Sequence, residues 1–328
     1  MEEILKVVPV LPPAIDTFRN ASPLWHPPDA QGIYGGICIA QSINAAQATV
    51  SIDFAVHSMH GKFLLAGKAD DMLEYRVSRC SDGRSFATRT VRTCQKDRII
   101  FIAVISFARD IPTASSRSLL HQEPMPRDIP LPPQSTRLDE THVPYVNKKV
   151  GMTNLNSSHP HDKRIHQWTR TTSKISPAGG IHAHISALSY ICDSYFVGTV
   201  PHVHNIWNFV KPPLTEFDDG GSDLSALSPI HTRIPLPDDG RTANTGRPRI
   251  SMMVTLSHTM LFHAPKAIKA DEWMLSELTS HWAGDGRGVA TQKIWSTDGT
   301  LLVTCIQEGV IRPEDNIQGR KTPAGSRL

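Results

Sequence analysis

Apolar and polar positions follow the same order of elements twice along the chain. In the first half, residues 37–50 contain alanine, isoleucine and glutamine but no proline, which predicts a helix buried on several sides. Runs rich in β-branched and aromatic residues then predict strands at 73–80, 85–93 and 99–107. In the second half, a helix from the glycine pair at 179–180 to about residue 197 is followed by strand patterns at 250–262, 273–280, 287–296 and 301–311.

Two short motifs recur at matching places in the two halves. Residues 82–88 return almost unchanged as residues 285–291, and in both copies an arginine follows 27 residues after the first aspartate. The segment Gly-Gly-Ile at 35–37 likewise returns at 179–181. Internal repetition of this kind predicts two copies of one module.

The order of elements within each copy predicts the fold. One helix followed by an antiparallel meander long enough to wrap around it is typical of a hotdog module, so the fold class expected is α+β. The expected architecture is a double hotdog, with two antiparallel sheets each wrapped around a long central helix, the helices side by side and the sheets continuous. The expected parts are an N-terminal module at 1–110, a Pro-rich linker at 111–165, a C-terminal module at 166–319 with a loop insertion at 211–249, and an exposed tail at 320–328.

Composition narrows the class of protein. Among 328 residues, 39% are hydrophobic and 20% charged, and the net charge of +3 comes without a basic block, which argues against nucleic-acid binding. The longest apolar stretch, residues 99–108, is about half of what a membrane span needs. The five cysteines form no CxxC pair, which favours reduced thiols and an intracellular compartment.

The last three residues are Ser326, Arg327 and Leu328. They form a conservative variant of the serine-lysine-leucine tail that the peroxisomal import receptor reads. The sequence therefore predicts a peroxisomal protein with that receptor as a partner. The alternative is a chance ending on a disordered tail.

Comparison of the two copies singles out three polar positions in the second half. Each position falls opposite a less polar residue of the first half when the copies are aligned on their shared motifs. The pairs are Asp193 with Thr49, Thr255 with Val56, and Gln307 with Val104.

Asp193 lies in an apolar helical segment, where an unpaired charge would be costly. The hydroxyl of Thr255 and the amide of Gln307 could supply its hydrogen-bond donors. A buried aspartate held in this way can orient a water molecule and take its proton. Each residue alone also fits a structural role: a paired carboxylate, an ordinary strand threonine, and an amide bonded to the backbone.

Ten segments together resemble a known family across nearly the whole chain. They lie at 34–36, 40–41, 56–60, 63–64, 82–86 and 88–89 in the first half and at 255–263, 271–273, 286–288 and 307–312 in the second. In this order they resemble the acyl-CoA thioesterase II family of double-hotdog hydrolases. The resemblance implies hydrolysis of acyl-CoA to a free acid and CoA, with an Asp–Thr–Gln trio around the attacking water that matches Asp193, Thr255 and Gln307.

Three positions depart from the family pattern. Ser257 stands where the family often has an acid, Leu261 where it has a tryptophan, and Ile37 where a glutamine is common. None of these changes removes the trio, but they leave the shape of the acyl pocket and the choice of substrate open. Peroxisomal fatty-acid metabolism and a secondary-metabolite pathway, such as toxin or polyketide synthesis, both remain open.

Other chemistries are less well supported. The chain has no G-x-S-x-G elbow for a serine nucleophile. Its histidine pairs, His57 with His60 and His258 with His263, lack the carboxylate or cysteine neighbours of a metal site, so we expect no metal and no cofactor. A hotdog enoyl-CoA hydratase and a non-catalytic acyl-CoA-binding protein are the rival functions. The turn at Gly35 and Gly36 is the candidate source of N–H groups that polarise the thioester carbonyl. A homo-oligomer is also left open.

Overall fold

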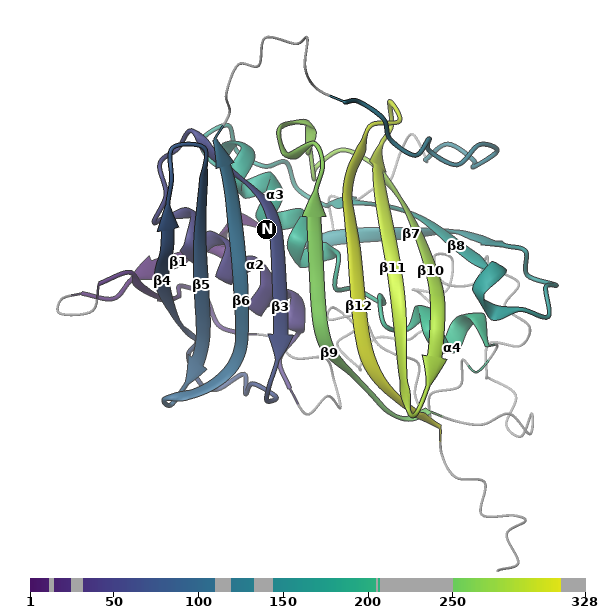
Figure 1. Ribbon diagram of the computed structural model, residues 1–328, viewed down its shortest axis with the longest axis horizontal. Coiled ribbons are helices and arrows are strands. Elements are labelled where there is room, and N and C mark those ends of the chain that lie inside the picture. Colours follow the sequence, from purple (N-terminus) through teal and green to yellow (C-terminus); the bar gives the residue numbers. More distant parts are fainter. Residues whose placement is uncertain are drawn as a thin grey trace, which may run out of the picture.

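Twelve strands of the described chain form one antiparallel sheet, and two longer helices lie behind it in the view of Figure 1. The computed structural model describes residues 1–11, 15–24, 32–109, 119–132, 144–204, 206 and 250–313. The insertion predicted at 211–249 and the C-terminal tripeptide lie outside these residues.

The elements of the two halves follow the predicted order. The first half contains α1 (Glu2–Leu5), β1 (Val7–Pro9), β2 (Thr17–Asn20), α2 (Gly35–Gln47), β3 (Phe54–Phe63), β4 (Glu74–Asp82), β5 (Phe86–Gln95) and β6 (Arg98–Arg109). The second half contains β7 (Tyr145–Thr153), η2 (Pro160–Asp162), β8 (Arg164–Thr171), α3 (Gly180–Ile191), α4 (Thr199–Val203), β9 (Ile250–Phe262), η3 (Pro265–Ala267), β10 (Met274–Gly284), β11 (Arg287–Ser296) and β12 (Leu301–Pro313). The seven strands predicted from sequence patterns are all present.

The sheets of the two halves join at their edges. The strand order is β1-β2-β4-β5-β6-β3-β9-β12-β11-β10-β8-β7, so β3 and β9 meet in the middle, as Figure 1 shows. Their antiparallel pairing runs from Ser58 opposite Leu261 to Lys62 opposite Ser257. The α+β class with an antiparallel sheet is therefore confirmed, and the sheets of the two halves are continuous as expected, because backbone hydrogen bonds cross between β3 and β9.

The predicted linker at 111–165 contains a strand and the start of another. β7 lies at one end of the sheet and pairs with β8 from Tyr145 opposite Thr171 to Thr153 opposite Arg164. An edge strand tolerates polar and charged residues. β7 contains two lysines and an asparagine, so its sequence resembles that of the surrounding linker and did not predict a strand. Residues 119–132 of the same range lie against the sheet. The Trp168 indole of β8 donates to the Pro130 carbonyl at 2.8 Å, and the Trp295 indole of β11 donates to the Glu123 carbonyl at 3.1 Å.

α3 ends earlier than predicted. The helix stops at Ile191 instead of continuing to about residue 197, and residues 192–198 form turns. Within these turns Tyr195 has a φ of +56°, in the left-handed region that a continuing helix cannot use. Asp193 is therefore a residue of the turn that follows the helix, two residues beyond its end.

Helices α2 and α3 pack closely where the start of α2 meets the end of α3. A Cβ atom at Gly36 would lie 2.6 Å from the Tyr190 carbonyl oxygen, so only glycine fits there. The Tyr34 hydroxyl donates to the same carbonyl at 2.8 Å. This approach brings the first turn of α2, from the first half of the chain, next to Asp193 of the second half.

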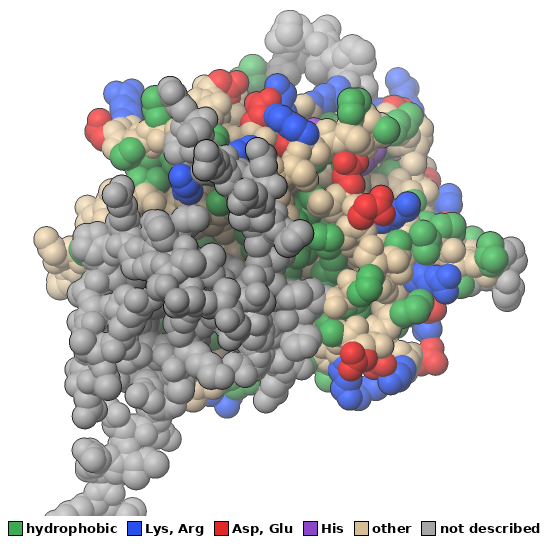
Figure 2. All heavy atoms as spheres, turned by 180° about the vertical axis from the view of Figure 1, so that it is seen from behind, with side chains coloured by type: hydrophobic (Ala, Val, Ile, Leu, Met, Phe, Trp, Pro, Cys, Tyr) green, Lys and Arg blue, Asp and Glu red, His purple; other side chains and the backbone are tan. Residues whose placement is uncertain are grey.

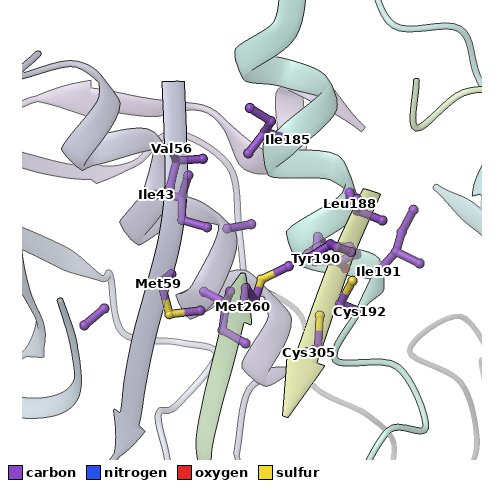
Figure 3. Close-up of a cluster of buried hydrophobic side chains, with 14 of the residues drawn as sticks. Ile43, Val56, Met59, Ile185, Leu188, Tyr190, Ile191, Cys192, Met260 and Cys305 are labelled. Carbon is purple, nitrogen blue, oxygen red and sulfur yellow. The ribbon is translucent and has the colours of Figure 1, made fainter. Parts of the chain in front are cut away.

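The apolar core fills the space between these helices and the central strands. Figure 3 shows Ile43 of α2 and Met59 of β3 on one side, Leu188 of α3 on the other, and Met260 of β9 between them. Met59 and Met260 are fully buried and pair directly across the β3–β9 junction. One core therefore crosses from one half of the chain to the other.

The described surface mixes charges of both signs. Figure 2, seen from the side opposite Figure 1, shows acidic and basic side chains lying close together over the described part of that face. Among the helices that the structure describes, none is long and apolar enough to cross a membrane.

Candidate active site

Asp193 lies at the start of helix α2, although it follows helix α3 in the sequence. Its side chain is only 7% exposed. The backbone N–H of Gly36 donates a hydrogen bond to the carboxylate, and a Cβ atom at Gly35 would lie 2.7 Å from Oδ2. The positive end of a helix favours an anion. The first turn of α2, in the first half of the chain, therefore stabilises the carboxylate of Asp193, which belongs to the second half.

Gln307 is the second member of the predicted trio, and it contacts Asp193 directly. Its side chain on β12 is fully buried, and its Nε2 donates to Asp193 Oδ1 at 2.7 Å. The second hydrogen of Nε2 is directed to Nδ1 of His258 at 3.2 Å. Its Oε1 is buried and has no hydrogen-bond partner among the described residues.

His258 also contributes to this site, although the sequence indicated it only as one of a pair of histidines with weak metal-binding potential. It is fully buried on β9, directly opposite Gln307 in the strand pairing. Burial lowers its pKa to about 3, so the ring is neutral at physiological pH. Because Nδ1 of His258 accepts a hydrogen bond from Gln307, the ring proton is assigned to Nε2 of His258. This Nε2 is buried and has no hydrogen-bond partner in the described chain.

The strand pattern contained a signal for His258. It precedes the buried Met260 by two residues, so the alternation of β9 puts it on the inner face. His263, its suggested metal partner, instead bonds Thr304 at 2.9 Å on an exposed part of the sheet. In the described ranges, no group of three or more His, Cys, Asp and Glu side chains is arranged to hold a metal ion.

Thr255 reaches the same face of the sheet through a β-bulge. Ser257 pairs with Glu308 while Thr255 pairs with Gly309, so Leu256 is an extra residue in β9. Without the bulge, Thr255 would face away from His258. The side chain of Thr255 is half-buried and makes no hydrogen bond with Asp193 or Gln307 within the described structure. The structure thus brings Asp193 and Gln307 into contact. Thr255 lies at the next strand pair on the same face of the sheet, opposite Gly309.

The environment of Asp193 changes its acidity. Burial raises the pKa of its carboxyl to about 6, and the hydrogen bonds from Gln307 and the Gly36 N–H act in the opposite direction. The group is then mostly ionised at pH 7 and is a much better proton acceptor than an ordinary aspartate. Next to it lies the unpaired Gln307 Oε1, which can accept a hydrogen bond from a water molecule. The arrangement can therefore hold and deprotonate water.

The alignment of Gln307 with Val104 is corrected by one residue. Val104 is 41% exposed and faces outward, opposite His60. The buried neighbour Ile105 takes the corresponding inner position. Bulges shift the register of strands by single residues, so equal spacing along the sequence did not preserve the face of the sheet.

Family models match both halves of the chain. Residues 22–108 match the acyl-CoA thioesterase N-terminal domain, and residues 120–311 match the acyl-CoA thioesterase C-terminal domain. Human acyl-coenzyme A thioesterase 8 is 30% identical to this chain, with 93% of the chain and 88% of the relative covered. The peroxisomal acyl-coenzyme A thioester hydrolase 1 of Saccharomyces cerevisiae is 24% identical, with 95% and 94% covered.

Solved structures agree with the family models. Acyl-CoA thioesterase II TesB2 from Mycobacterium marinum is 25% identical, has a TM-score of 0.67, and is matched over 97% of this chain and 99% of its own. A protein with a hot dog fold from Alicyclobacillus acidocaldarius is 14% identical, with a TM-score of 0.57 and 95% and 97% covered. The fold is thus of the hotdog type, while the boundaries of two separate hotdog modules stay a prediction. With both domain models matched over most of its length, the chain belongs to the acyl-CoA thioesterase family of thioester hydrolases.

Proposed function

We propose that the protein hydrolyses acyl-CoA to a free acid and CoA by direct attack of a water molecule that Asp193 deprotonates. The observation that supports this most is the buried carboxylate of Asp193, held by Gln307 and by the Gly36 N–H with a pKa raised to about 6. Neither a metal nor a cofactor takes part, and no acyl-enzyme forms.

Each neighbour of Asp193 has a distinct part in this mechanism. Gln307 donates to the carboxylate through Nε2 and accepts from the water through Oε1, which fixes the water beside its base. His258 holds the Gln307 amide in that orientation by accepting its second hydrogen. Thr255 pairs with Gly309, two pairs further along β9 and on the same face, and we assign its hydroxyl to hold the water from that side.

The start of α2 lies where negative charge develops in the reaction. Attack on the thioester gives an oxyanion, which the positive end of a helix stabilises. The Gly36 N–H was expected to polarise the thioester carbonyl, but it bonds the Asp193 carboxylate. We therefore assign two roles to the Gly35–Gly36 turn. It orients the Asp193 carboxylate through the Gly36 N–H, and the positive end of α2 stabilises negative charge on the oxygen of the thioester carbonyl.

Substitution of the base tests the mechanism. Asp193→Asn keeps the shape and the hydrogen bond to the Gly36 N–H but cannot accept a proton, so kcat with a medium-chain acyl-CoA should fall about 10²–10⁴-fold. Released CoA thiol is the readout, and a circular dichroism melt checks that the variant is folded. An unchanged kcat in a folded variant would refute the role of Asp193.

We also propose that the protein acts in peroxisomes. The support is the tripeptide at 326–328 together with the similarity to the yeast relative, which is a peroxisomal acyl-coenzyme A thioester hydrolase. A fluorescent protein fused ahead of the chain should colocalise with a peroxisomal marker and lose that pattern when the three residues are deleted. Colocalisation that survives the deletion would show that the tripeptide is not the address. Whether the pathway is general fatty-acid metabolism or secondary-metabolite synthesis depends on the acyl group.

A further inference from the structure

Two glycines lie opposite each other on the inner face of the sheet, close to Gln307. Gly288 of β11 pairs directly with Gly309 of β12. The next pair on the same face is that of Ala290 with Gln307. Side chains two residues apart in a strand point to the same face, so the glycine pair shares the buried inner face with Gln307. On two neighbouring strands, the sheet therefore has no side chain at this place.

The backbone does not require glycine at either position. Neither Gly288 nor Gly309 has a positive φ, unlike Gly286 in the turn before β11. A glycine inside a strand costs stability, and it often marks a place where another part of the molecule approaches closely. The glycine pair therefore points to the segment that packs above it.

Residues 192–200, which carry the proposed base and are called the base segment below, pack onto this glycine pair. A Cβ atom at Gly309 would overlap Cγ2 of Val197. A Cβ atom at Gly288 would lie 2.7 Å from Cγ1 of Val200, which is 2% exposed. The two valines thus fill the space that side chains at 288 and 309 would take.

The close approach of the base segment to the sheet brings Asp193 to its partner. Oδ1 of Asp193 lies 2.7 Å from Nε2 of Gln307, which donates to it from β12. Val197 follows Asp193 by four residues, and the Val200 N–H donates to the Val197 carbonyl at 3.2 Å, so the two valines belong to one turn close to the base. A movement of these valines away from the sheet would therefore carry Asp193 away from Gln307.

The first half has the opposite arrangement at the matching pair. Ala87 of β5 pairs with Phe107 of β6, and the next pair on the same face contains Ile105, the counterpart of Gln307. Phe107 is fully buried. There a large ring from the sheet fills the inner face, so the strand pairing itself does not need glycines at this place. The glycine pair is found in the half that carries the proposed base.

We propose that Gly288 and Gly309 are positioning residues: without side chains there, the base segment comes close enough to hold the base against its amide partner. The inference rests on the proposed thioesterase function. A methyl group added at Gly309 cannot be avoided by rotating Val197, because a β-branched side chain is restricted in χ1. The base segment would instead move away from the sheet by about 1 Å, which stretches the hydrogen bond from Gln307 to Asp193. This is less than the diameter of a water molecule, so the carboxylate stays out of contact with solvent.

Compensating substitutions in the full chain test the proposal. Gly309→Ala should lower kcat with octanoyl-CoA about 10–100-fold with little change in KM, because the base is misplaced. The pH midpoint of kcat should rise, since the hydrogen bond from Gln307 lowers the pKa of Asp193 and is weakened in this variant. The double variant of Gly309→Ala with Val197→Ala should recover most of the kcat and the wild-type midpoint, because the Val197 Cβ lies 3.5 Å from the added methyl, an ordinary contact distance.

A circular dichroism melt of each variant separates this role from a purely structural one. A glycine needed only for folding would lower the melting temperature without moving the pH midpoint, and that result overturns the proposal. A loss of kcat that Val197→Ala does not reduce also overturns it, because the cause would then be the strand itself, where the added methyl lies 3.0 Å from the Val254 carbonyl oxygen. If Gly309→Ala does not fold, Gly288→Ala with and without Val200→Ala decides, because the atoms nearest to its added methyl belong to side chains only.

Failure of this inference is distinguishable from failure of the proposed function. If the wild-type chain releases no CoA from octanoyl-CoA, the proposed function fails. Carbon-13 NMR of the Asp193 carboxyl, assigned by its absence in Asp193→Asn, then tests the glycine pair without turnover. The titration midpoint should be higher in Gly309→Ala than in the wild type and should return in the double variant, and an unmoved midpoint overturns the inference.

Discussion

The same two inner positions of the repeated module hold Met59 and Ile105 in the first half and His258 and Gln307 in the second. Met59 pairs with Ile105, and His258 with Gln307. Met59 and His258 are each the second residue after a bulge, and all four side chains are fully buried or nearly so. The fold therefore accepts an apolar pair at this place, and the polar pair of the second half is not required for packing.

The positions that follow the two helices differ in the same way. Thr49 and Asp193 each lie two residues after the end of their helix. The Arg89 side chain donates to the Thr49 hydroxyl at 2.8 Å and to the Thr49 carbonyl at 3.0 Å, so Thr49 is fixed by a buried cation. Asp193 instead receives only neutral donors, which leaves its carboxylate able to accept a proton. This difference supports placing the proposed base in the second half of the chain.

Exchanging Gln307 for the first-half residue should have the largest effect. In Gln307→Ile the water loses its acceptor, and kcat should fall about 10²-fold. The Gln307 hydrogen bond lowers the pKa of Asp193, so its loss should also move the midpoint of the kcat–pH profile above about 6. Gln292→Leu is the matched control, because Gln292 is equally buried but bonds Ser276.

The rate at high pH separates the two roles of Gln307. If the residue only tunes acidity, the variant should regain the wild-type kcat well above the new midpoint. A deficit that persists there shows that the amide also positions the water. A profile with an unmoved midpoint and an unchanged kcat would contradict the proposed site.

How far the sequence predicted this site depends on whether a residue acts within one element or across several. Asp193 and Gln307 were identified because the two copies differ at these positions, and the strands were identified from their alternation. His258 was missed because its role depends on the strand pairing that places it opposite Gln307. The contact between the Gly36 N–H and Asp193 joins residues far apart in the sequence and required the packing of two helices. The continuity of the sheet was expected from the double-hotdog pattern, but no local pattern encodes the register in which β3 meets β9.

Removing the charge of Asp193 should stabilise the fold. A buried carboxyl whose pKa is raised from the ordinary value near 4 to about 6 binds protons more tightly when folded, so stability is greatest below pH 4 and falls as pH rises to 6. At pH 7.5 Asp193→Asn should therefore be more stable by up to about 3 kcal/mol, reduced by the loss of one hydrogen bond, because an amide nitrogen cannot accept the one that Gln307 donates to Oδ1. Urea unfolding at pH 5 and pH 7.5 measures this, and the difference between variant and wild type should be larger at the higher pH. A variant that is less stable than the wild type at pH 7.5 would mean that the Asp193 carboxylate stabilises the fold, as the buried guanidinium of Arg89 does in the first half.

The smallest effect is expected when His258 alone is exchanged for its first-half counterpart. His258→Met removes the acceptor that orients the Gln307 amide but leaves the hydrogen bond from Gln307 Nε2 to Asp193. We therefore expect kcat to fall about tenfold with little change in KM. His258→Asn, which offers an amide oxygen in place of Nδ1, should recover part of the rate. Because the neutral ring carries no charge at pH 7, the pH midpoint should stay close to that of the wild type. A midpoint that moves by a full pH unit would instead show that His258 acts on Asp193 directly, across the 3.9 Å that separates Nδ1 from Oδ1.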